Sequence, residues 1–203
     1  MRVLLKGIHR VRYRLASGTY AIYYYAWPRL IGQPGTPEFM RSTALLRAFC
    51  EAVERRDGRS FASLFSEDGV YHDAFYGAFD GRAKIAELIN DWFYRTARDF
   101  HWEMREPLTN GHMLYARYAF SYVSTLPEAQ GRRVGFEGVS IMKLRDDLIS
   151  EYREIANVGP ALVALGFAPE RVCKILAREG KRLREAPEMA RHRLADQPQL
   201  KGA

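Results

Sequence analysis

The stretch Val70-Tyr71-His72-Asp73-Ala74-Phe75-Tyr76-Gly77-Ala78-Phe79-Asp80-Gly81-Arg82 decides how this chain is interpreted. Residues 70–73 have the pattern of a short strand, an aromatic loop follows, and Gly81-Arg82 opens a segment with helical spacing. Asp73 is the acid at the end of the strand, beside aromatic side chains. If its side chain points into a pocket, the chemistry of the protein would start at Asp73.

Helical patterns flank this stretch on both sides. Upstream, Ser42 is an N-cap candidate for a helix that ends near residues 57–58, and residues 61–65 indicate a shorter helix that residues 67–69 terminate. Downstream, apolar residues recur at helical spacing, which predicts one long amphipathic helix from about Arg82 to Ala97.

The period then changes from 3.6 to 2, which is typical of strands. Strands are predicted from residue 100 onward and at 112–125, 134–144 and 148–156, with short turns between them. Helices first and a meander of long strands afterwards indicate an α+β fold, in which a curved antiparallel sheet wraps around helices.

Three segments are expected: an N-terminal extension at 1–39, one domain at 40–157 and a helical C-terminal extension at 158–203. Within the last, 158–167 and 169–184 have helical patterns. The apolar side chains predicted to face inward from the second of these helices are Val172, Ile175, Leu176 and Leu183.

The charge of the chain lies mainly at its ends. The net charge is +7, of which residues 1–39 carry +5 and residues 168–203 carry +4, leaving −2 for the segment between them. Nucleic acid is therefore not expected as a partner of the core. A length of 203 residues with 47% hydrophobic content is enough for one substantial core.

Residues 1–39 combine arginines with tyrosines and almost no acids. A transit peptide or an interfacial anchor that contacts a membrane fits this composition, and so does an extension without regular structure or a start placed too early, with Met40 just before the first helix. We favour the last two interpretations over membrane contact.

Cysteine and histidine usage indicates neither disulfides nor a metal site. Cys50 and Cys173 are far apart, and the histidines lack ligand spacing. We expect no cofactor, no metal and a cytoplasmic location. The longest uncharged run, 15–28, is shorter than the about 20 apolar residues that span a bilayer.

The pattern of residues 42–156 resembles the nuclear transport factor 2-like superfamily, which includes ketosteroid isomerases, limonene epoxide hydrolases and SnoaL-like polyketide cyclases. Three matching pieces carry the resemblance: 67–73, the helix start at 81–85, and 138–155. The resemblance implies a cone-shaped fold and a homodimer formed through the outer face of the sheet. It says little about activity, because one fold hosts many functions.

Resemblance to the ketosteroid isomerases implies that Asp73 is a general base. It also shows two departures, because Phe49 replaces the family's tyrosine and Ser140 replaces its protonated aspartate. Without those donors an enolate would lack the hydrogen bonds that make such a site fast. Steroid isomerisation by that mechanism is therefore not expected.

Resemblance to the limonene epoxide hydrolases implies a different use of the same pocket. Tyr71 and Asp73 take the place of the family's water-binding pair, Glu154 that of the last-strand carboxylate, and Arg117 that of the arginine. Ala119 stands where the family has its proton-donating acid, so epoxide opening by that mechanism lacks a donor.

Strand alternation gives the same candidates independently, because residues two apart share a face. If the faces that carry Arg117, Ser140 and Glu154 are concave, one cavity contains them together with Asp73. The predicted catalytic residues are Asp73, Glu154 and Arg117, and the predicted substrate-binding residues are Tyr71, Tyr115, Ser140 and Tyr152.

Two functional interpretations of the core follow, and a third gives the basic ends of the chain a role in salt-sensitive binding to nucleic acid or a membrane. The first is a SnoaL-like pocket protein that binds a hydrophobic small molecule and acts as an acid–base isomerase, hydrolase or cyclase. The second is a non-catalytic ligand-binding or dimerisation module, which a cavity filled by Phe75, Phe79 and the C-terminal helix would favour. A structural role is also open for Arg117, as the partner of Glu154 or Asp73 in an internal ion pair.

Overall fold

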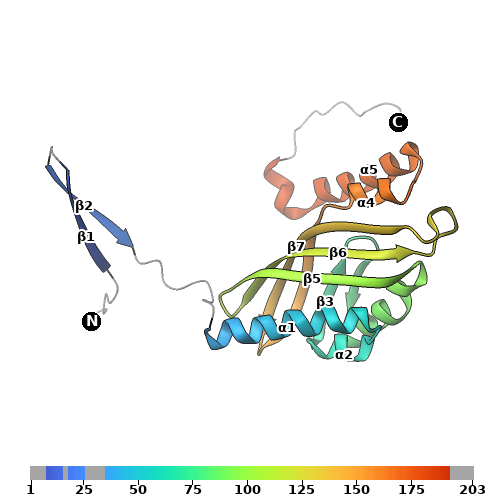
Figure 1. The fold of residues 1–203 in the computed structure, drawn as a ribbon, viewed down its shortest axis with the longest axis horizontal. Helices are drawn as coiled ribbons and strands as arrows, with labels where there is room; N and C mark the ends of the chain where they lie inside the picture. Colours follow the sequence, from blue (N-terminus) through green and yellow to red (C-terminus); the bar gives the residue numbers. More distant parts are fainter. Residues whose placement is uncertain (1–7, 16–17, 26–34, 193–203) are drawn as a thin grey trace.

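A computed structural model describes residues 8–15, 18–25 and 35–192 of the chain. Between residues 35 and 192 it shows the predicted α+β fold, with a curved six-stranded sheet in the order β4-β3-β8-β7-β6-β5 (Figure 1). Helix α1 runs along one side of the sheet, while α4 and α5 lie at the opposite side of the same body.

The first helix, α1 (Pro37–Glu54), begins five residues before the predicted N-cap at Ser42. Thr36 caps it instead, because its Oγ1 accepts from the Phe39 N–H at 3.3 Å and Pro37 occupies the first turn. Helix α2 (Gly58–Ser63) follows, capped by Asp57.

The stretch around Asp73 is a β-hairpin. Strand β3 (Phe65–Asp73) pairs antiparallel with β4 (Gly77–Asp80), which corrects the prediction of a loop there. Residues 67–69, predicted to end a helix, lie inside β3 where its pairing with β8 shifts register. Gly77 has a φ of +93°, which suits the tight turn from Asp73.

The predicted helix over residues 82–97 is helical to Arg95 but changes type twice. It is α-helical in α3 (Arg82–Glu87), π-helical in η1 (Leu88–Trp92) and a 3₁₀ turn in η2 (Phe93–Arg95). Ile85, Leu88 and Ile89 are fully buried, as their spacing predicts. The π-helical turn shifts the following side chains relative to a regular helix.

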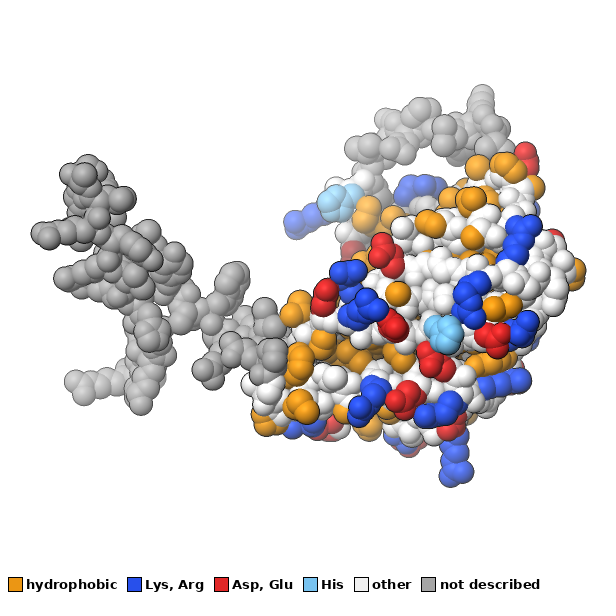
Figure 2. Space-filling view, in the orientation of Figure 1, with side chains coloured by type: hydrophobic (Ala, Val, Ile, Leu, Met, Phe, Trp, Pro, Cys, Tyr) orange, Lys and Arg blue, Asp and Glu red, His pale blue; other side chains and the backbone are white. Residues whose placement is uncertain are grey.

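The four meander strands agree closely with the predicted ones. They are β5 (Ala97–Thr109), β6 (Met113–Ser124), β7 (Arg133–Arg145) and β8 (Leu148–Ala156), all antiparallel in sequence, with a 3₁₀ turn η3 (Pro127–Ala129) after β6. The face of the body seen in Figure 2 carries acidic and basic side chains side by side. The apolar core lies beneath the sheet, against α1 to η2.

The C-terminal segment forms the predicted helices, α4 (Gly159–Ala164) and α5 (Pro169–Glu185), and ends in η4 (Pro187–His192). The inward orientation predicted for Leu176 and Leu183 is wrong, since they are 41% and 59% exposed. No residue of α5 is fully buried. The helix packs at the edge of a core that the other elements already form, so its apolar side chains are only partly buried.

Residues 8–15 and 18–25 form a second sheet, of two strands. Strands β1 (Ile8–Leu15) and β2 (Gly18–Tyr25) pair antiparallel, in register from Ile8 with Tyr25 to Leu15 with Gly18. Within the segment predicted as an N-terminal extension, residues 8–15 and 18–25 are therefore strands. The arginines at 10, 12 and 14 alternate with apolar residues, which is the period of a strand. Among the described residues, no helix is both long enough and apolar enough to cross a membrane.

Candidate functional site

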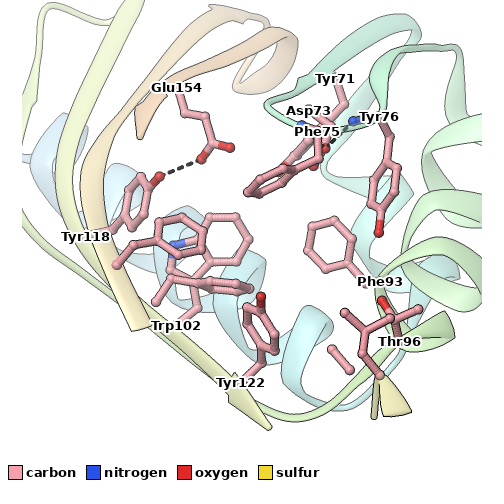
Figure 3. A pocket seen from close by; sticks show the side chains of 14 residues that line it. Tyr71, Asp73, Phe75, Tyr76, Phe93, Thr96, Trp102, Tyr118, Tyr122 and Glu154 are labelled. Carbon is pink, nitrogen blue, oxygen red and sulfur yellow. Dashed lines mark hydrogen bonds between the residues drawn. The ribbon is translucent and has the colours of Figure 1, made fainter. Parts of the chain in front are cut away.

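A cavity of about 90 Å³ lies at the end of the sheet where β3 and β8 meet the helical segment after α3 (Figure 3). Nine of its fourteen lining residues are aromatic, and only Asp73 and Glu154 are acidic. Apolar walls with a few convergent polar groups are typical of a small-molecule site.

The pairing of β3 with β8 brings the two acids together. The strands run parallel, with Tyr71 opposite Tyr152, and the rings of these tyrosines stack at 4.4 Å between centroids. Asp73 and Glu154 each stand two residues farther along, so they project from the same face at adjacent strand ends. The sheet therefore presents a carboxyl pair to the cavity.

Asp73 is 5% exposed and is held by the turn that follows it. Its Oδ1 accepts from the backbone N–H groups of Phe75 at 2.7 Å and Tyr76 at 2.8 Å. Burial raises the pKa of Asp73, while these two N–H groups and the Arg182 guanidinium oppose the rise. These two hydrogen bonds favour the ionised form of Asp73 and fix the position of its Oδ1.

Glu154 is held by two tyrosines. Its Oε2 accepts from the Tyr118 hydroxyl at 2.8 Å, drawn in Figure 3, and from the Tyr152 hydroxyl at 3.2 Å. Burial, and then the neighbouring Asp73 carboxylate, raise the pKa of Glu154 to about 7, against the lowering effect of the two hydroxyls. Two like charges at adjacent positions disfavour double ionisation. Glu154 therefore holds a proton in a large fraction of molecules near neutral pH.

Gly138 makes the hydrogen bond of Tyr118 possible. It stands opposite Tyr118 in the β6–β7 register, and the Tyr118 ring lies across it. A Cβ at residue 138 would meet the Tyr118 hydroxyl oxygen at 2.5 Å and the Ile155 carbonyl oxygen at 2.5 Å. Only glycine leaves room for Tyr118 to reach Glu154 on β8.

Two further polar atoms of the lining have no partner within the described residues. The Tyr71 hydroxyl and the Trp102 indole N–H are buried and without a hydrogen bond there. Burial raises the pKa of Tyr71 well above its usual value, so the hydroxyl keeps its proton. Each is a donor available to a molecule in the cavity.

Three predicted site residues line the cavity: Tyr71, Asp73 and Glu154. Ser140 and Tyr152 are fully buried behind it, where the Ser140 Oγ and the Tyr152 hydroxyl lie 3.0 Å apart. These two residues support Glu154 rather than line the cavity.

The placement of Arg117 and Tyr115 in the cavity is wrong. Both project from the outer face of β6: Tyr115 is 40% exposed, and Arg117 pairs with Glu106 at 3.3 Å. The internal ion pair of Arg117 with either acid is therefore wrong as well. Alternation shows which residues share a face but not which face is inward. From Leu114 to Phe120 the even-numbered residues of β6 are the buried ones.

Sequence reasoning missed Tyr118 and Trp102 as site residues. Trp102 belongs to the alternating apolar residues of β5, and it pairs with Phe120 of β6. Tyr118 lies two residues from Phe120, on the same face of β6. The alternation of Phe100, Trp102 and Met104 already marked the inward face of β5, and cross-strand pairing transfers that phase to β6. Phe49, in place of the family's tyrosine, is fully buried and packs edge-on against Trp102.

No three residues among His, Cys, Asp and Glu cluster as a metal-ligand set within the described part of the chain. Phe79, a residue expected to fill the cavity in a non-catalytic module, packs instead against Trp92 at 5.8 Å between ring centroids and does not line the cavity. The other aromatic residue of that expectation, Phe75, does line it.

Comparison with solved structures shows the same fold in several proteins. TsrD from Streptomyces laurentii is 18% identical, with a TM-score of 0.54 over 63% of this chain and 96% of that one. An epoxide hydrolase of the LEH-like type from M. tuberculosis is 17% identical, with a TM-score of 0.52 over 70% and 99%. A protein of ketosteroid isomerase-like fold from Catenulispora acidiphila, solved with trimethylamine, is 15% identical, with a TM-score of 0.56 over 62% and 95%.

No curated protein matches the chain at the sequence level. A family model of the SnoaL-like domain, however, matches residues 46–152, more than half of the chain and the segment that contains both Asp73 and Tyr118. With this match and the shared fold, the chain belongs to the SnoaL-like domain family, within the nuclear transport factor 2-like superfamily.

Proposed function

We propose that this protein is an acid–base enzyme for a hydrophobic small molecule, in which Asp73 accepts a proton and Glu154 supplies one. The observation that carries the proposal is the carboxyl pair at adjacent ends of β3 and β8 inside an aromatic cavity. Isomerisation is the simplest reaction of such a pair, and hydrolysis or cyclisation uses the same two proton transfers.

The environments of the two acids assign their roles. Asp73 accepts two backbone hydrogen bonds that favour its carboxylate, so it is the general base. Glu154, with a pKa of about 7, holds a proton in a large fraction of molecules at neutral pH and is the general acid. In the first step Asp73 removes a proton from carbon or water, and Glu154 delivers its own proton to the developing oxyanion or leaving oxygen. In an isomerisation the Asp73 proton then returns to a different carbon and Glu154 regains its proton from the enol hydroxyl. In a hydrolysis the two groups are reset by proton exchange with water.

This assignment also supplies the donors that the resemblance lacks at Phe49, Ser140 and Ala119. Glu154 is the proton donor, and the Tyr71 hydroxyl and the Trp102 indole N–H are unpaired donors in the same cavity. Hydrogen bonds from buried donors stabilise negative charge that develops in a transition state.

The test uses two small probes that match the cavity: 3-cyclohexen-1-one for proton-transfer isomerisation and cyclohexene oxide for hydrolysis. We expect the wild-type chain to convert at least one, with kcat/KM following a bell-shaped pH profile whose alkaline limb reports Glu154 near pH 7. Asp73→Asn and Glu154→Gln should each lower kcat/KM by about 100-fold or more.

Glu106→Gln is the matched control, because this carboxyl lies on the outer face beside Arg117 and should leave the rate unchanged. A converted probe whose rate is the same in wild type, Asp73→Asn and Glu154→Gln would contradict the roles given to the two acids. Binding of both probes without conversion of either would favour the non-catalytic ligand-binding interpretation.

A further inference from the structure

A second hollow adjoins the aromatic cavity on the side of α5. This groove, of about 420 Å³, lies between the turn after Asp73, the segment after β8 and one face of α5. It shares exactly two lining residues with the aromatic cavity, Phe75 and Glu154. These two side chains therefore form the boundary between the two spaces.

The groove is mainly apolar away from this boundary. Ala74 and Ala156 line it from the sheet, and Ile175 and Leu176 line it from α5. Leu176 remains 41% exposed, so the apolar stripe of α5 faces a space that the protein does not fill.

Two charged side chains of α5 pair with each other, and one of them also bonds the helix to the turn after Asp73. Arg182 pairs with Glu179 at 2.7 Å and donates to the Ala74 carbonyl oxygen at 3.4 Å. Ala74 directly follows Asp73, so α5 is anchored next to the carboxyl pair. The apolar part of α5 is thereby held beside Phe75 and Glu154, which line both spaces.

We propose that the aromatic cavity and the groove are two parts of one site, which takes an elongated, mainly apolar molecule. Its reacting end lies between Asp73 and Glu154, and its tail passes Phe75 and lies along Ile175 and Leu176 of α5. This inference rests on the proposed function for the identity of the reacting end.

The volumes support one long ligand. A space of about 90 Å³ holds only roughly three waters, or a compact group of similar size. The groove is several times larger, and Glu154 is the one lining residue that faces both spaces with an acidic group. Helix α5 lies outside the segment that matches the family model, residues 46–152.

The test measures Kd by calorimetry for linear ketones from pentan-2-one to undecan-2-one with the full-length chain. Once the short end fills the aromatic cavity, each further methylene should lower Kd by about fourfold, which corresponds to about 0.8 kcal/mol. Leu176→Trp fills the groove at a partly exposed position, so the gain with length should stop while pentan-2-one binds within twofold of wild type. Ile175→Trp repeats the test from the neighbouring lining position.

Leu183→Trp is the matched control, since Leu183 lies on the same helix, is 59% exposed and does not line the groove. It should keep the full dependence on chain length. A Kd that stops falling in wild type after the shortest ketones, or that falls equally in Leu176→Trp, would overturn the groove as part of the site. Such a result leaves the proposed function intact, because Asp73→Asn tests that separately, whereas no binding at any length would contradict both.

Discussion

At the scale of single residues, the site depends on two neighbouring carboxyl groups that differ in their hydrogen-bond donors and in their pKa. Asp73 accepts hydrogen bonds from two backbone N–H groups of the turn that follows it. Glu154 accepts hydrogen bonds from two tyrosine hydroxyls and has the Asp73 carboxylate near it. Burial acts on both, but the charge of Asp73 acts further on Glu154 and raises its pKa to about 7. Pairs whose environments push their pKa values apart are typical of acid–base sites.

The raised pKa of Glu154 makes stability depend on pH. The native state holds this proton more tightly than the unfolded chain, in which a glutamate has a pKa of about 4.5, so stability should fall as pH rises from 4.5 to 7. The full effect is roughly 3 kcal/mol, and Glu154→Gln should abolish that part of the decline. Urea unfolding at pH 5, 6, 7 and 8 measures it.

Above pH 7, Glu154→Gln should therefore be more stable than wild type, since the glutamine carbonyl oxygen can still accept from Tyr118 and Tyr152. Glu106→Gln, on the outer face, should follow the wild-type curve. Parallel stability curves for wild type and Glu154→Gln over this range would show that Glu154 is not perturbed.

The family resemblance and strand alternation together located Asp73 and Glu154 but not Arg117. Asp73 ends β3, Glu154 lies near the end of β8, and both line the cavity. For Arg117 the strand was predicted correctly and its phase was wrong, because aromatic side chains occur on both faces of β6. The pairing of Trp102 with Phe120, a contact between strands, determines that phase.

At the scale of elements, β7 contributes to the site through Gly138, a residue without a side chain. Gly138 lets the Tyr118 ring cross from β6 to Glu154 on β8. The long strands were predictable within one to three residues from their period of two. The hairpin of β3 with β4 and the π-helical turn of η1 were not, because both depend on tertiary packing that local patterns do not report.

Gly138→Ala tests this account of β7. The new methyl group would overlap Tyr118 and the Ile155 carbonyl oxygen, so we expect a loss of about 1 to 3 kcal/mol in the free energy of unfolding. Displacing Tyr118 also removes a hydrogen bond that lowers the pKa of Glu154, so that pKa should rise further above 7. Urea unfolding and the pH–rate profile measure the two effects.

Gly180→Ala is the control for this substitution. Gly180 lies inside α5, and a Cβ there comes no closer than 3.5 Å to any side chain beyond its two neighbours in sequence, so stability should increase by up to about 1 kcal/mol. If Gly138→Ala behaves like Gly180→Ala in both measurements, the role given to Gly138 is wrong.

At the scale of the whole molecule, the site exists because segments far apart in sequence become neighbours. The parallel contact of β3 with β8 joins residues about eighty positions apart, and Arg182 of α5 reaches back to Ala74. Local patterns predicted both strands and α5, but not that α5 would leave Leu176 facing a groove. That outcome depends on a core already completed by α1 to β8.

The central claim is that Glu154, buried in the cavity near the Asp73 carboxylate, holds a proton close to neutral pH, and a carboxyl titration by ¹³C NMR tests it most directly. With glutamate side chains labelled and Glu154 assigned from the Glu154→Gln spectrum, Glu154 should titrate near pH 7 in wild type. In Asp73→Asn, where the neighbouring charge is removed, it should titrate at a lower pH. A Glu154 signal that titrates near pH 4.5 in both proteins would contradict the claim.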